Sequence, residues 1–455
     1  MQINPNIFKT YDIRGIYGED FNEDTAYLLA VAYAELRKKE IPEKKLSIVV
    51  GRDMRESSKT LKKSLIKGLI ESGVDVVDIG LSSTPTFYFA VANFDYDGGI
   101  IITASHNPKQ WNGFKLVREK AIPISKDTGI DILRDKIINN NFKKSSTQGN
   151  IIELENVLKT QINHDLKFAD IKKIKPLKIA VDTANGMGAQ YIEELFKHLP
   201  CELIKINFEL DGNFPAHEAD PLKEKNLLDI KTKVLEEKAD LGIAIDGDGD
   251  RIFFIDENGN TIDQSIIRGI LAMLFLREKP GSKICYDIRP GRITRDLIEE
   301  HGGIPIITKV GHSLIKEQML KENAYFAGES SGHFFLNMDI GCFEVPVIII
   351  LKLLQEFSES GKKISEYIRP HQKYFHSGEI NSKVDLEYEQ VFKKVISAFP
   401  YGKINRLDGI TIEYPDFWFN VRGSNTENKL RLNLEAKTKK LMEEKRDEAL
   451  NVIRG

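Results

Sequence analysis

Short runs of apolar residues, many of them β-branched, recur along this chain, and each run ends in a polar turn. Runs of this length bounded by turn residues are typical of buried strands, and the segments between them carry apolar residues at helical spacing. The order strand, helix, strand, helix, strand occurs three times. The predicted strands are residues 46–53, 74–78 and 99–103, then 177–183, 202–206 and 241–245, then 283–289, 304–308 and 324–327. Strands that alternate with helices form mixed or parallel sheets covered by helices, so each repeat is expected to be an α/β domain.

The two ends of the chain differ from these repeats. Residues 7–16 alternate apolar and polar side chains, which predicts an edge strand, and a helix is expected at about 25–39. Residues 371–455 alternate like an antiparallel sheet and carry a charged helix at about 438–452. We therefore expect three similar α/β domains with mixed sheets and a smaller C-terminal α+β domain, arranged around a central cleft.

Polar, turn-rich segments indicate where the domains meet. Residues 139–150 are rich in Asn, Lys and Ser, and residues 256–260 predict a hairpin turn. Arg369-Pro370-His371 follows an apolar helix expected at 346–357. The expected domains are residues 1–150, 151–255, 256–370 and 371–455.

Charge and composition exclude several classes of partner. The 65 basic and 68 acidic residues are balanced, with no long basic block, so neither nucleic acid nor a membrane surface is expected as a partner. The longest apolar run, 345–354, is interrupted and too short to span a bilayer, and residues 1–5 lack the features of a signal peptide. The three cysteines are widely spaced, which favours a reducing cytoplasm and disfavours a thiolate metal site.

Each third strand of the repeat runs directly into a loop of unusual composition. These loops are residues 104–108, 246–251 and 328–333. In the first, Pro108 prevents a helical continuation, so Ser105 is expected on a loop at the carboxyl end of a strand, where open α/β sheets bind their ligands. Because equivalent strand ends can converge, we expect the three loops to face one cleft.

The second loop indicates a metal site. Asp246, Asp248 and Asp250 alternate with glycines, and three carboxylates so close would repel one another unless a hard divalent cation neutralised them. An EF-hand is rejected because Arg251 stands where that motif needs glycine and because the flanking segments are predicted strands. The ligands suit magnesium or calcium.

The third loop and a segment near the C-terminus indicate substrate contacts. Residues 328–332 match the Gly-x-Ser-x-Gly nucleophile elbow by letter, but residues 333–336 are expected to be extended, whereas that elbow leads into a helix. A set of donors and acceptors for sugar hydroxyls fits better. Residues 422–426 combine a guanidinium, two hydroxyls and an amide, which suit a phosphate dianion.

Taken together, these four segments resemble the signature loops of the α-D-phosphohexomutases. The matching residues are Thr103-Ala104-Ser105-His106-Asn107-Pro108, the Asp-Gly-Asp-Gly-Asp-Arg loop at 246–251, and the segments at 328–333 and 422–426. They occur in the family's order over essentially the whole chain. Tyr11-Asp12-Ile13-Arg14-Gly15 and Ser424-Asn425-Thr426 are most similar to the bacterial phosphomannomutase/phosphoglucomutase group, since the phosphoglucosamine branch usually shows Ser-Gly-Thr in the last loop. Gly423, where alanine is frequent, and Glu344-Val345-Pro346, which replaces an acidic-glycine pair, depart from that group's pattern.

The resemblance implies a reaction and a role for each residue. Ser105 would rest as a phosphoserine and exchange its phosphoryl group with a sugar monophosphate through a hexose 1,6-bisphosphate. Asp246, Asp248 and Asp250, with Ser105, would hold Mg²⁺, and Arg251 would add a fixed positive charge. The other implied catalytic residues, for proton transfer or orientation, are Arg14, His106, Lys115 and His312. The implied substrate-binding residues are Tyr11, Arg289, Glu329, Ser331, His333, Arg422, Ser424, Asn425 and Thr426.

Substrate and assembly stay open at this point. The expected activity interconverts hexose 6-phosphate and hexose 1-phosphate, with mannose and/or glucose as the sugar. A phosphoglucosamine mutase is an alternative within the same superfamily, and a metal-dependent sugar phosphatase or a sugar-phosphate binding protein is an alternative outside it. The expected partners are small sugar phosphates, and the protein could be a monomer or a dimer.

Overall fold

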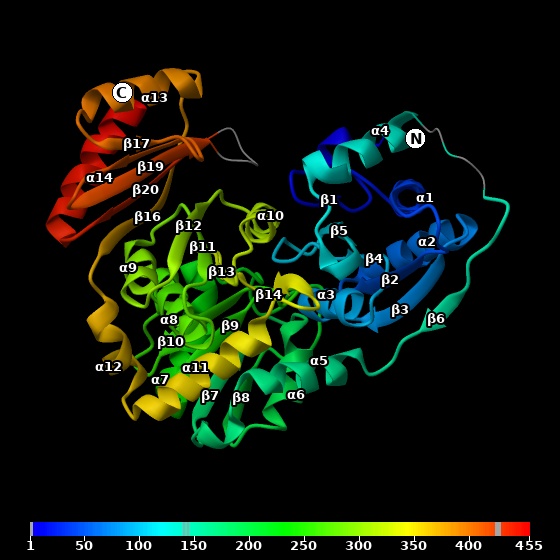
Figure 1. Cartoon of the computed structure of the whole chain (residues 1–455), viewed down its shortest axis with the longest axis horizontal. Helices are drawn as coiled ribbons and strands as arrows, with labels where there is room; N and C mark the ends of the chain where they lie inside the picture. Colours follow the sequence, from blue (N-terminus) through cyan, green and yellow to red (C-terminus); the bar gives the residue numbers. More distant parts are fainter. Residues whose placement is uncertain (1–2, 140–141, 143–144, 424–428) are drawn as a thin grey trace. The chain divides into compact units, whose positions relative to one another are not determined.

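The computed structural model describes residues 3–139, 142, 145–423 and 429–455. Figure 1 labels the helices and strands of the chain. The chain divides into two compact units. The first unit contains residues Met1–Ile262 and Ser331–Tyr367, and the second contains residues Asp263–Ser330 and Ile368–Gly455. Each unit combines sheets and helices, and each is described by itself below.

The first sheet of the first unit has six strands in the order β1-β5-β4-β2-β3-β6. β2, β3, β4 and β6 are parallel, and β5 runs antiparallel to β4 and β1. β1 is an edge strand as predicted, although it is shorter than the alternating segment suggested. The strands are β1 (Ile13–Ile16), β2 (Ser47–Arg52), β3 (Asp75–Leu81), β4 (Gly98–Ile102), β5 (Trp111–Arg118) and β6 (Ile151–Glu153).

Helices cover both faces of this sheet. Side chains alternate along β4, so Ile100 and Ile102 join the core formed with α1, α2 and α4. On the opposite face α3 packs so closely that a Cβ at Gly99 would lie 2.6 Å from the Phe87 ring. The helices are α1 (Glu23–Glu40), α2 (Glu56–Glu71), α3 (Thr84–Asn93), α4 (Asp131–Asn139) and α5 (Val157–Asp165). Burial on both faces explains why β4 is apolar throughout.

A second, four-stranded sheet in the first unit has the order β10-β9-β7-β8. β7, β8 and β9 are parallel, and β10 returns antiparallel to β9. Its elements are β7 (Lys178–Asp182), α6 (Gly188–Phe196), β8 (Glu202–Ile206), α7 (Leu228–Glu237), β9 (Leu241–Ile245) and β10 (Ile252–Asp256). The first unit also contains the antiparallel pair β14 (Phe334–Met338) and β15 (Gly341–Glu344), followed by α11 (Pro346–Ser360). Because β14 directly follows Gly332 and His333, the nucleophile-elbow geometry is absent from this segment.

The second unit begins with parallel strands β11, β12 and β13, in the hydrogen-bonded order β12-β11-β13. The elements are α8 (Gln264–Glu278), β11 (Lys283–Asp287), α9 (Arg292–Glu300), β12 (Ile304–Thr308), α10 (His312–Glu322) and β13 (Phe326–Gly328). A short helix, α12 (Ile364–Ile368), precedes the C-terminal part.

The C-terminal part is an antiparallel sheet with the order β16-β20-β19-β18-β17, as the alternating sequence predicted. One face packs on α13 and α14 through a core that includes Phe419, Val421 and Leu432. The elements are β16 (Phe375–Ser382), α13 (Tyr388–Ala398), β17 (Lys403–Asn405), β18 (Ile410–Glu413), β19 (Phe417–Gly423), β20 (Leu430–Ala436) and α14 (Lys439–Arg454). The opposite face carries polar residues, Arg422 and Glu435 among them.

Candidate active site

Ser105 lies in the first unit, immediately beyond β4, in a strained backbone conformation. Its φ of +50° falls in the left-handed region, and its side chain is buried. The backbone N–H of Ser105 donates to Thr103 Oγ1 at 2.9 Å, which fixes the turn. The Ser105 Oγ donates to Asp246 Oδ2 at 2.9 Å and lies 3.1 Å from His106 Nδ1. The predicted reactive serine and the predicted metal loop are therefore in direct contact.

A buried arginine that the sequence analysis did not single out holds the serine loop in place. Arg55 Nη2 donates to the backbone carbonyls of Ser105 at 2.9 Å and Asn107 at 2.6 Å. Its Nη1 donates to the carbonyls of Pro108 at 2.9 Å and Trp111 at 3.1 Å. Arg55 is 1% exposed, so its charge depends on the paired carboxylate of Asp53 at 3.2 Å. The sequence does carry a signal for Arg55. It lies in the polar turn after β2, and this turn is another strand end of the same sheet.

The aspartate loop connects β9 to β10 and is folded tightly around Asp246. Asp246 Oδ1 accepts the backbone N–H groups of Gly249, Asp250 and Arg251 at 3.1–3.2 Å. Gly249 has a φ of +80°, which favours glycine. A Cβ at Gly247 would lie 2.5 Å from the carbonyl oxygen of Ser105, so the absence of a side chain allows the two loops to meet.

The three carboxylates of this loop form a buried cluster that could hold a metal ion. Ligand oxygens of Asp246, Asp248 and Asp250 lie within 4.8 Å of one another. Asp248 Oδ1 is buried and accepts no hydrogen bond from any described residue, and buried Asp250 Oδ1 has the His333 Nε2 nitrogen at 3.3 Å but no close hydrogen bond. Buried carboxylate oxygens without donors are costly, and a hard divalent cation would satisfy them. The donor set therefore fits the predicted metal.

Lys115 and Thr84 fix the orientation of the metal loop. Lys115 Nζ lies 2.7 Å from Asp248 Oδ2 and 2.6 Å from Asp250 Oδ2. Although burial disfavours its charge, these two carboxylates raise the pKa of Lys115 well above its ordinary value. Thr84, at the start of α3, donates its hydroxyl to Asp248 Oδ2 at 2.6 Å. Lys115 was predicted and Thr84 was not, because Thr84 is close to the aspartates only in the folded chain.

Burial and neighbouring charges set the protonation of this cluster. Burial, together with the charges of Asp250 and Asp248, raises the pKa of Asp246 well above its usual range. Burial acts in the same direction on Asp250, but Lys115 and His333 outweigh it and hold the pKa of Asp250 well below its usual range. Desolvation of the imidazole, and then the nearby guanidiniums of Arg251 and Arg14, lower the pKa of His106. His106 is therefore neutral near pH 7.

Other predicted residues of the first unit surround the same loops. Arg14 Nη1 donates to Asn107 Oδ1 at 2.7 Å. Arg251 Nε lies 3.8 Å from Asp246 Oδ2 and donates to His333 Nε2 at 3.4 Å. His333 Nδ1 lies 3.0 Å from the Ser331 hydroxyl, and its Nε2 lies 3.3 Å from Asp250 Oδ1. Tyr11 is half-buried and lies two residues before β1.

The second unit holds the predicted residues Arg289, His312, Glu329 and Arg422. Arg289 Nη2 lies 3.1 Å from Glu329 Oε1, which also accepts the backbone N–H of Gly311 at 2.9 Å, next to His312 at the start of α10. Burial of Arg289 opposes its charge, but Asp287 and Glu329 raise the pKa of the guanidinium.

Arg422 forms part of a group of cations around one carboxylate. Its Nη2 lies 2.5 Å from Glu379 Oε2, and Arg431 Nη1 lies 2.9 Å from Glu379 Oε1. Burial raises the pKa of Glu379, but Arg422, Arg289 and Arg431 outweigh it and lower that pKa. Asp287, Glu379 and Arg431 were not predicted, because their roles depend on neighbours distant in sequence. Ser424, Asn425 and Thr426 lie outside the described residues, so their predicted contacts stay predictions.

The serine at the end of β4 contacts a buried cluster of three aspartates that could hold a metal ion. This arrangement suits phosphoryl transfer. The chain belongs to the phosphoglucomutase/phosphomannomutase family. Four models of that family match: alpha/beta/alpha domain I at residues 5–144, domain II at 158–259, domain III at 263–374 and the C-terminal domain at 379–452. The enzyme is accordingly an intramolecular phosphotransferase of the phosphohexomutase superfamily. The predicted family is confirmed, and so is the predicted fold class of three α/β domains with mixed sheets and a C-terminal domain built on an antiparallel sheet.

Curated relatives and solved structures agree with this assignment. A phosphomannomutase of Methanocaldococcus jannaschii is 42% identical over 451 residues, which are 98% of this chain and 97% of the relative. A phosphomannomutase of Vibrio cholerae is 38% identical, with 98% of each chain covered. The crystal structure of a phosphoglucomutase/phosphomannomutase family protein from Burkholderia thailandensis superimposes with a TM-score of 0.90 at 30% identity, covering 99% of this chain and 98% of that one. Among the described residues, no helix combines the length and apolar character needed to cross a bilayer.

Proposed function

We propose that this enzyme interconverts hexose 6-phosphate and hexose 1-phosphate, with mannose and/or glucose as the sugar, through a phosphoserine at Ser105 and a hexose 1,6-bisphosphate. The observation that carries the proposal is the contact between the Ser105 hydroxyl and Asp246 in the cluster of three aspartates. The names of the full-length relatives, both phosphomannomutases, support the choice of sugar. We also propose that the enzyme acts in the cytoplasm, on its balanced charge and unpaired cysteines.

The proposed metal is Mg²⁺, held by Asp246, Asp248, Asp250 and the phosphorylated Ser105. When bound, it would neutralise charge on the transferring phosphoryl oxygens. Lys115 keeps two of the aspartates in position, and the Arg251 guanidinium adds positive charge beside Asp246. Positioning and charge neutralisation of this kind account for most of the catalysis of phosphoryl transfer.

In the first transfer, a sugar hydroxyl oxygen forms a bond to phosphorus while the bond from phosphorus to Ser105 Oγ breaks. The proton that the hydroxyl loses is the one that Ser105 Oγ gains. The neutral imidazole of His106, with Nδ1 3.1 Å from that oxygen, is placed to relay it, accepting the proton at one ring nitrogen and donating from the other. The second transfer reverses these steps with the other phosphate of the bisphosphate, so no net phosphate is released.

Residues of both units are proposed to bind the substrate. Glu329 and Ser331 accept and donate hydrogen bonds to sugar hydroxyls, with Tyr11 and His333 as further contacts. Arg289 and Arg422, with Ser424, Asn425 and Thr426, bind the phosphate that is not reacting. The convergence of Arg422, Arg431 and Arg289 on the single carboxylate of Glu379 supports an anion site there.

Intact mass spectrometry and kinetics test the covalent step. The purified enzyme is expected to carry one phosphoryl group, mapped by peptide analysis to Ser105, and Ser105→Ala should abolish both the added mass and turnover. Ser146→Ala, which changes an exposed serine of the same unit, serves as the control. Full turnover in Ser105→Ala would refute the mechanism.

Coupled assays test the substrate and the metal. Mannose 1-phosphate, glucose 1-phosphate and glucosamine 1-phosphate are each supplied with Mg²⁺ and a hexose 1,6-bisphosphate activator. We expect turnover with mannose or glucose phosphate, its loss on chelation, and its return with Mg²⁺. A preference for the glucosamine compound would instead identify a phosphoglucosamine mutase, and stoichiometric release of inorganic phosphate would identify a phosphatase.

A further inference from the structure

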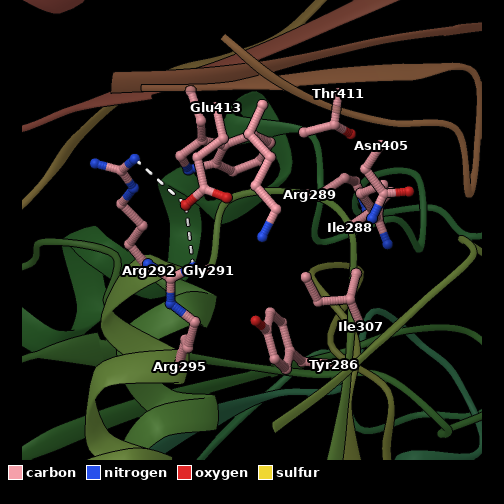
Figure 2. Close-up of a pocket in the computed structure, with 12 residues that line it drawn as sticks. Tyr286, Ile288, Arg289, Gly291, Arg292, Arg295, Ile307, Asn405, Thr411 and Glu413 are labelled. Carbon is pink, nitrogen blue, oxygen red and sulfur yellow. Dashed lines mark hydrogen bonds and ion pairs between the residues drawn. The ribbon is translucent and has the colours of Figure 1, made fainter. Parts of the chain in front are cut away.

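The second unit contains a pocket whose lining residues, except Arg289, have no role in the proposed mechanism. It has a volume of about 190 Å³ and lies between the α9 side of the unit and the strands β17 and β18 (Figure 2). Its lining includes Tyr286, Arg292, Arg295, Lys403, Glu413 and Trp418. The guanidinium of Arg289 is already paired with Asp287 and Glu329, so the remaining side chains set the character of the pocket.

The charges of the lining are unequal. Apart from Arg289, three cations, Arg292, Arg295 and Lys403, face the single carboxylate of Glu413. Arg295 Nη1 lies 3.1 Å and Arg292 Nη2 lies 3.6 Å from the same oxygen, Glu413 Oε1. The exposed ammonium of Lys403 has no ion-pair partner among the described residues. The pocket therefore favours an anion.

Arg292 keeps its charge while it ties the two sides of the pocket together. Its Nη1 donates to the carbonyl of Pro415 at 3.0 Å, and its Nη2 donates to the carbonyls of Tyr414 at 2.5 Å and Phe417 at 3.3 Å. Carbonyls satisfy the donors without neutralising the guanidinium, and Nε is buried with no acceptor among the described residues. Glu413 Oε1, 3.6 Å from Nη2, offsets part of the charge of Arg292, and the remainder adds to the positive potential of the pocket.

The hydroxyl of a mostly buried tyrosine provides a second, independent indication of a ligand. Tyr286 is 5% exposed as a residue, and its hydroxyl forms no hydrogen bond with another described residue and is open to the pocket, where a ligand can accept from it. Figure 2 shows this hydroxyl pointing into the pocket, on the side of Arg295. Ile288 and Ile307 add apolar surface, and Trp418 adds an aromatic wall. The lining thus combines cationic donors, a hydroxyl donor and a carbon-rich surface.

We propose that this pocket binds a small phosphomonoester, with the phosphate held by Arg295, Lys403 and the Tyr286 hydroxyl and the organic part against Ile307 and Trp418. A tetrahedral dianion accepts several charge-assisted hydrogen bonds at once, which matches donors arriving from α9, β11 and β17. Such a ligand is held by α9 and by the C-terminal sheet together, so it stabilises their association within the second unit.

Trp418 provides a direct readout, because the chain has only one other tryptophan, Trp111. In a Trp111→Phe background, the fluorescence of Trp418 is titrated with glycerol 3-phosphate. Glycerol and inorganic phosphate are titrated separately, to distinguish the ester from its two parts. We expect a saturable change with glycerol 3-phosphate, weaker binding of inorganic phosphate and no change with glycerol.

Variants test whether the fluorescence change of Trp418 comes from binding in this pocket. Lys403→Gln and Tyr286→Phe are each expected to weaken binding, by about fivefold or more for the lysine because a charge-assisted contact is lost. The exposed Lys439→Gln should bind normally, and mutase turnover should be unchanged in Lys403→Gln. Binding unaffected by Lys403→Gln, no saturable change, or a signal that disappears in Arg422→Lys but survives Lys403→Gln would each overturn the proposal. The last result would place the phosphate at Arg422 instead.

Discussion

At the scale of single residues, Arg55 shows how one buried side chain can hold the loop of the proposed reactive serine. Its four hydrogen bonds to carbonyls span Ser105 to Trp111, so the position of the serine depends on the planar fork of a guanidinium. A lysine would keep the charge opposite Asp53 but could not reach all four acceptors. Arg55 touches the backbone and not the substrate, so it is a positioning residue.

We therefore predict that Arg55→Lys lowers kcat about 10- to 100-fold, with a smaller effect on KM, because a misplaced phosphoserine loop loses its alignment with the metal cluster. Steady-state mutase kinetics give both constants, and circular dichroism checks that the fold persists. Arg52→Lys, at the last residue of β2 and three residues before Arg55, serves as the control. If Arg55→Lys had the same kcat as the parent enzyme, the Ser105 loop would keep its shape without the Arg55 guanidinium.

At the scale of elements, the loops after β4 and β9 meet because glycine occupies position 247. A methyl group there would lie 2.5 Å from the Ser105 carbonyl oxygen and 3.3 Å from the Ala219 side chain. The first of these neighbours is backbone, which cannot rotate away. The two loops would have to separate to admit the methyl group.

Gly247→Ala is thus expected to reduce kcat by about 100-fold while lowering stability by only ~1–3 kcal/mol. The measurements are mutase turnover and thermal unfolding. Gly302→Ala is the matched control, because Gly302 also stands in a tight turn but has open space around its Cβ position. It should lose about 1 kcal/mol through its positive φ and keep full activity. Equal losses of activity in the two variants would contradict the steric explanation.

A second contact between elements predicts a dependence of stability on pH. His376 of β16 is hydrogen-bonded to Asp263, the residue that caps α8 through the backbone N–H of Ser265 at 2.7 Å. The bond to Asp263 raises the pKa of His376 above its ordinary 6.5. Burial opposes ionisation of Asp263, but the bond to His376 outweighs it and lowers the pKa of Asp263. The imidazole is partly exposed, so the pair contributes less than ~1 kcal/mol.

His376 and Asp263 make stability change with pH in opposite directions. The contribution of His376 is complete below pH 6.5 and is lost as the pH rises through its raised folded-state pKa. The contribution of Asp263 is complete above its unfolded-state pKa, near 4, and is lost on acidification. His376→Gln should therefore lower the unfolding temperature most between about pH 5 and 6.5 and least near pH 9. A difference that grows toward pH 9 would refute the ion pair.

At the scale of the whole molecule, local pattern was enough to predict the repeated units but not the side chains that support the site. The end of each third strand can be predicted from the sequence. In β4, for example, Ile100, Ile101 and Ile102 are apolar and a polar turn follows. Ser105 and the aspartate loop were predictable for the same reason, since each lies next to its strand in sequence. Arg55, Thr84 and Glu379 act across 50, 164 and 43 residues of chain, respectively. Only folding brings such residues to their partners. The domain boundaries at residues 150, 255 and 370 stay predictions.

The residues of the two units have different proposed roles, which leads to a prediction about kinetics. The proposed phosphoserine and the three aspartates proposed to hold the metal belong to the first unit, whereas Arg422 and Arg289 belong to the second. If Arg422 binds the phosphate that is not reacting, its loss removes binding without disturbing the chemistry at Ser105. Arg422 is 1% exposed and paired with Glu379, so lysine, which keeps the charge, is the informative substitution.

Arg422→Lys is expected to raise KM for the hexose phosphate about 10- to 100-fold, since a point charge replaces bidentate binding, and to change kcat less. Intact mass spectrometry should still find the phosphoryl group on Ser105, because the variant leaves the first unit unchanged. Steady-state kinetics with glucose 1-phosphate and mannose 1-phosphate separate the two constants. Arg406→Lys, at an exposed position of the same unit, is the control. A variant that loses kcat and the phosphoserine together, at unchanged KM, would instead assign Arg422 to the chemical step and not to substrate binding.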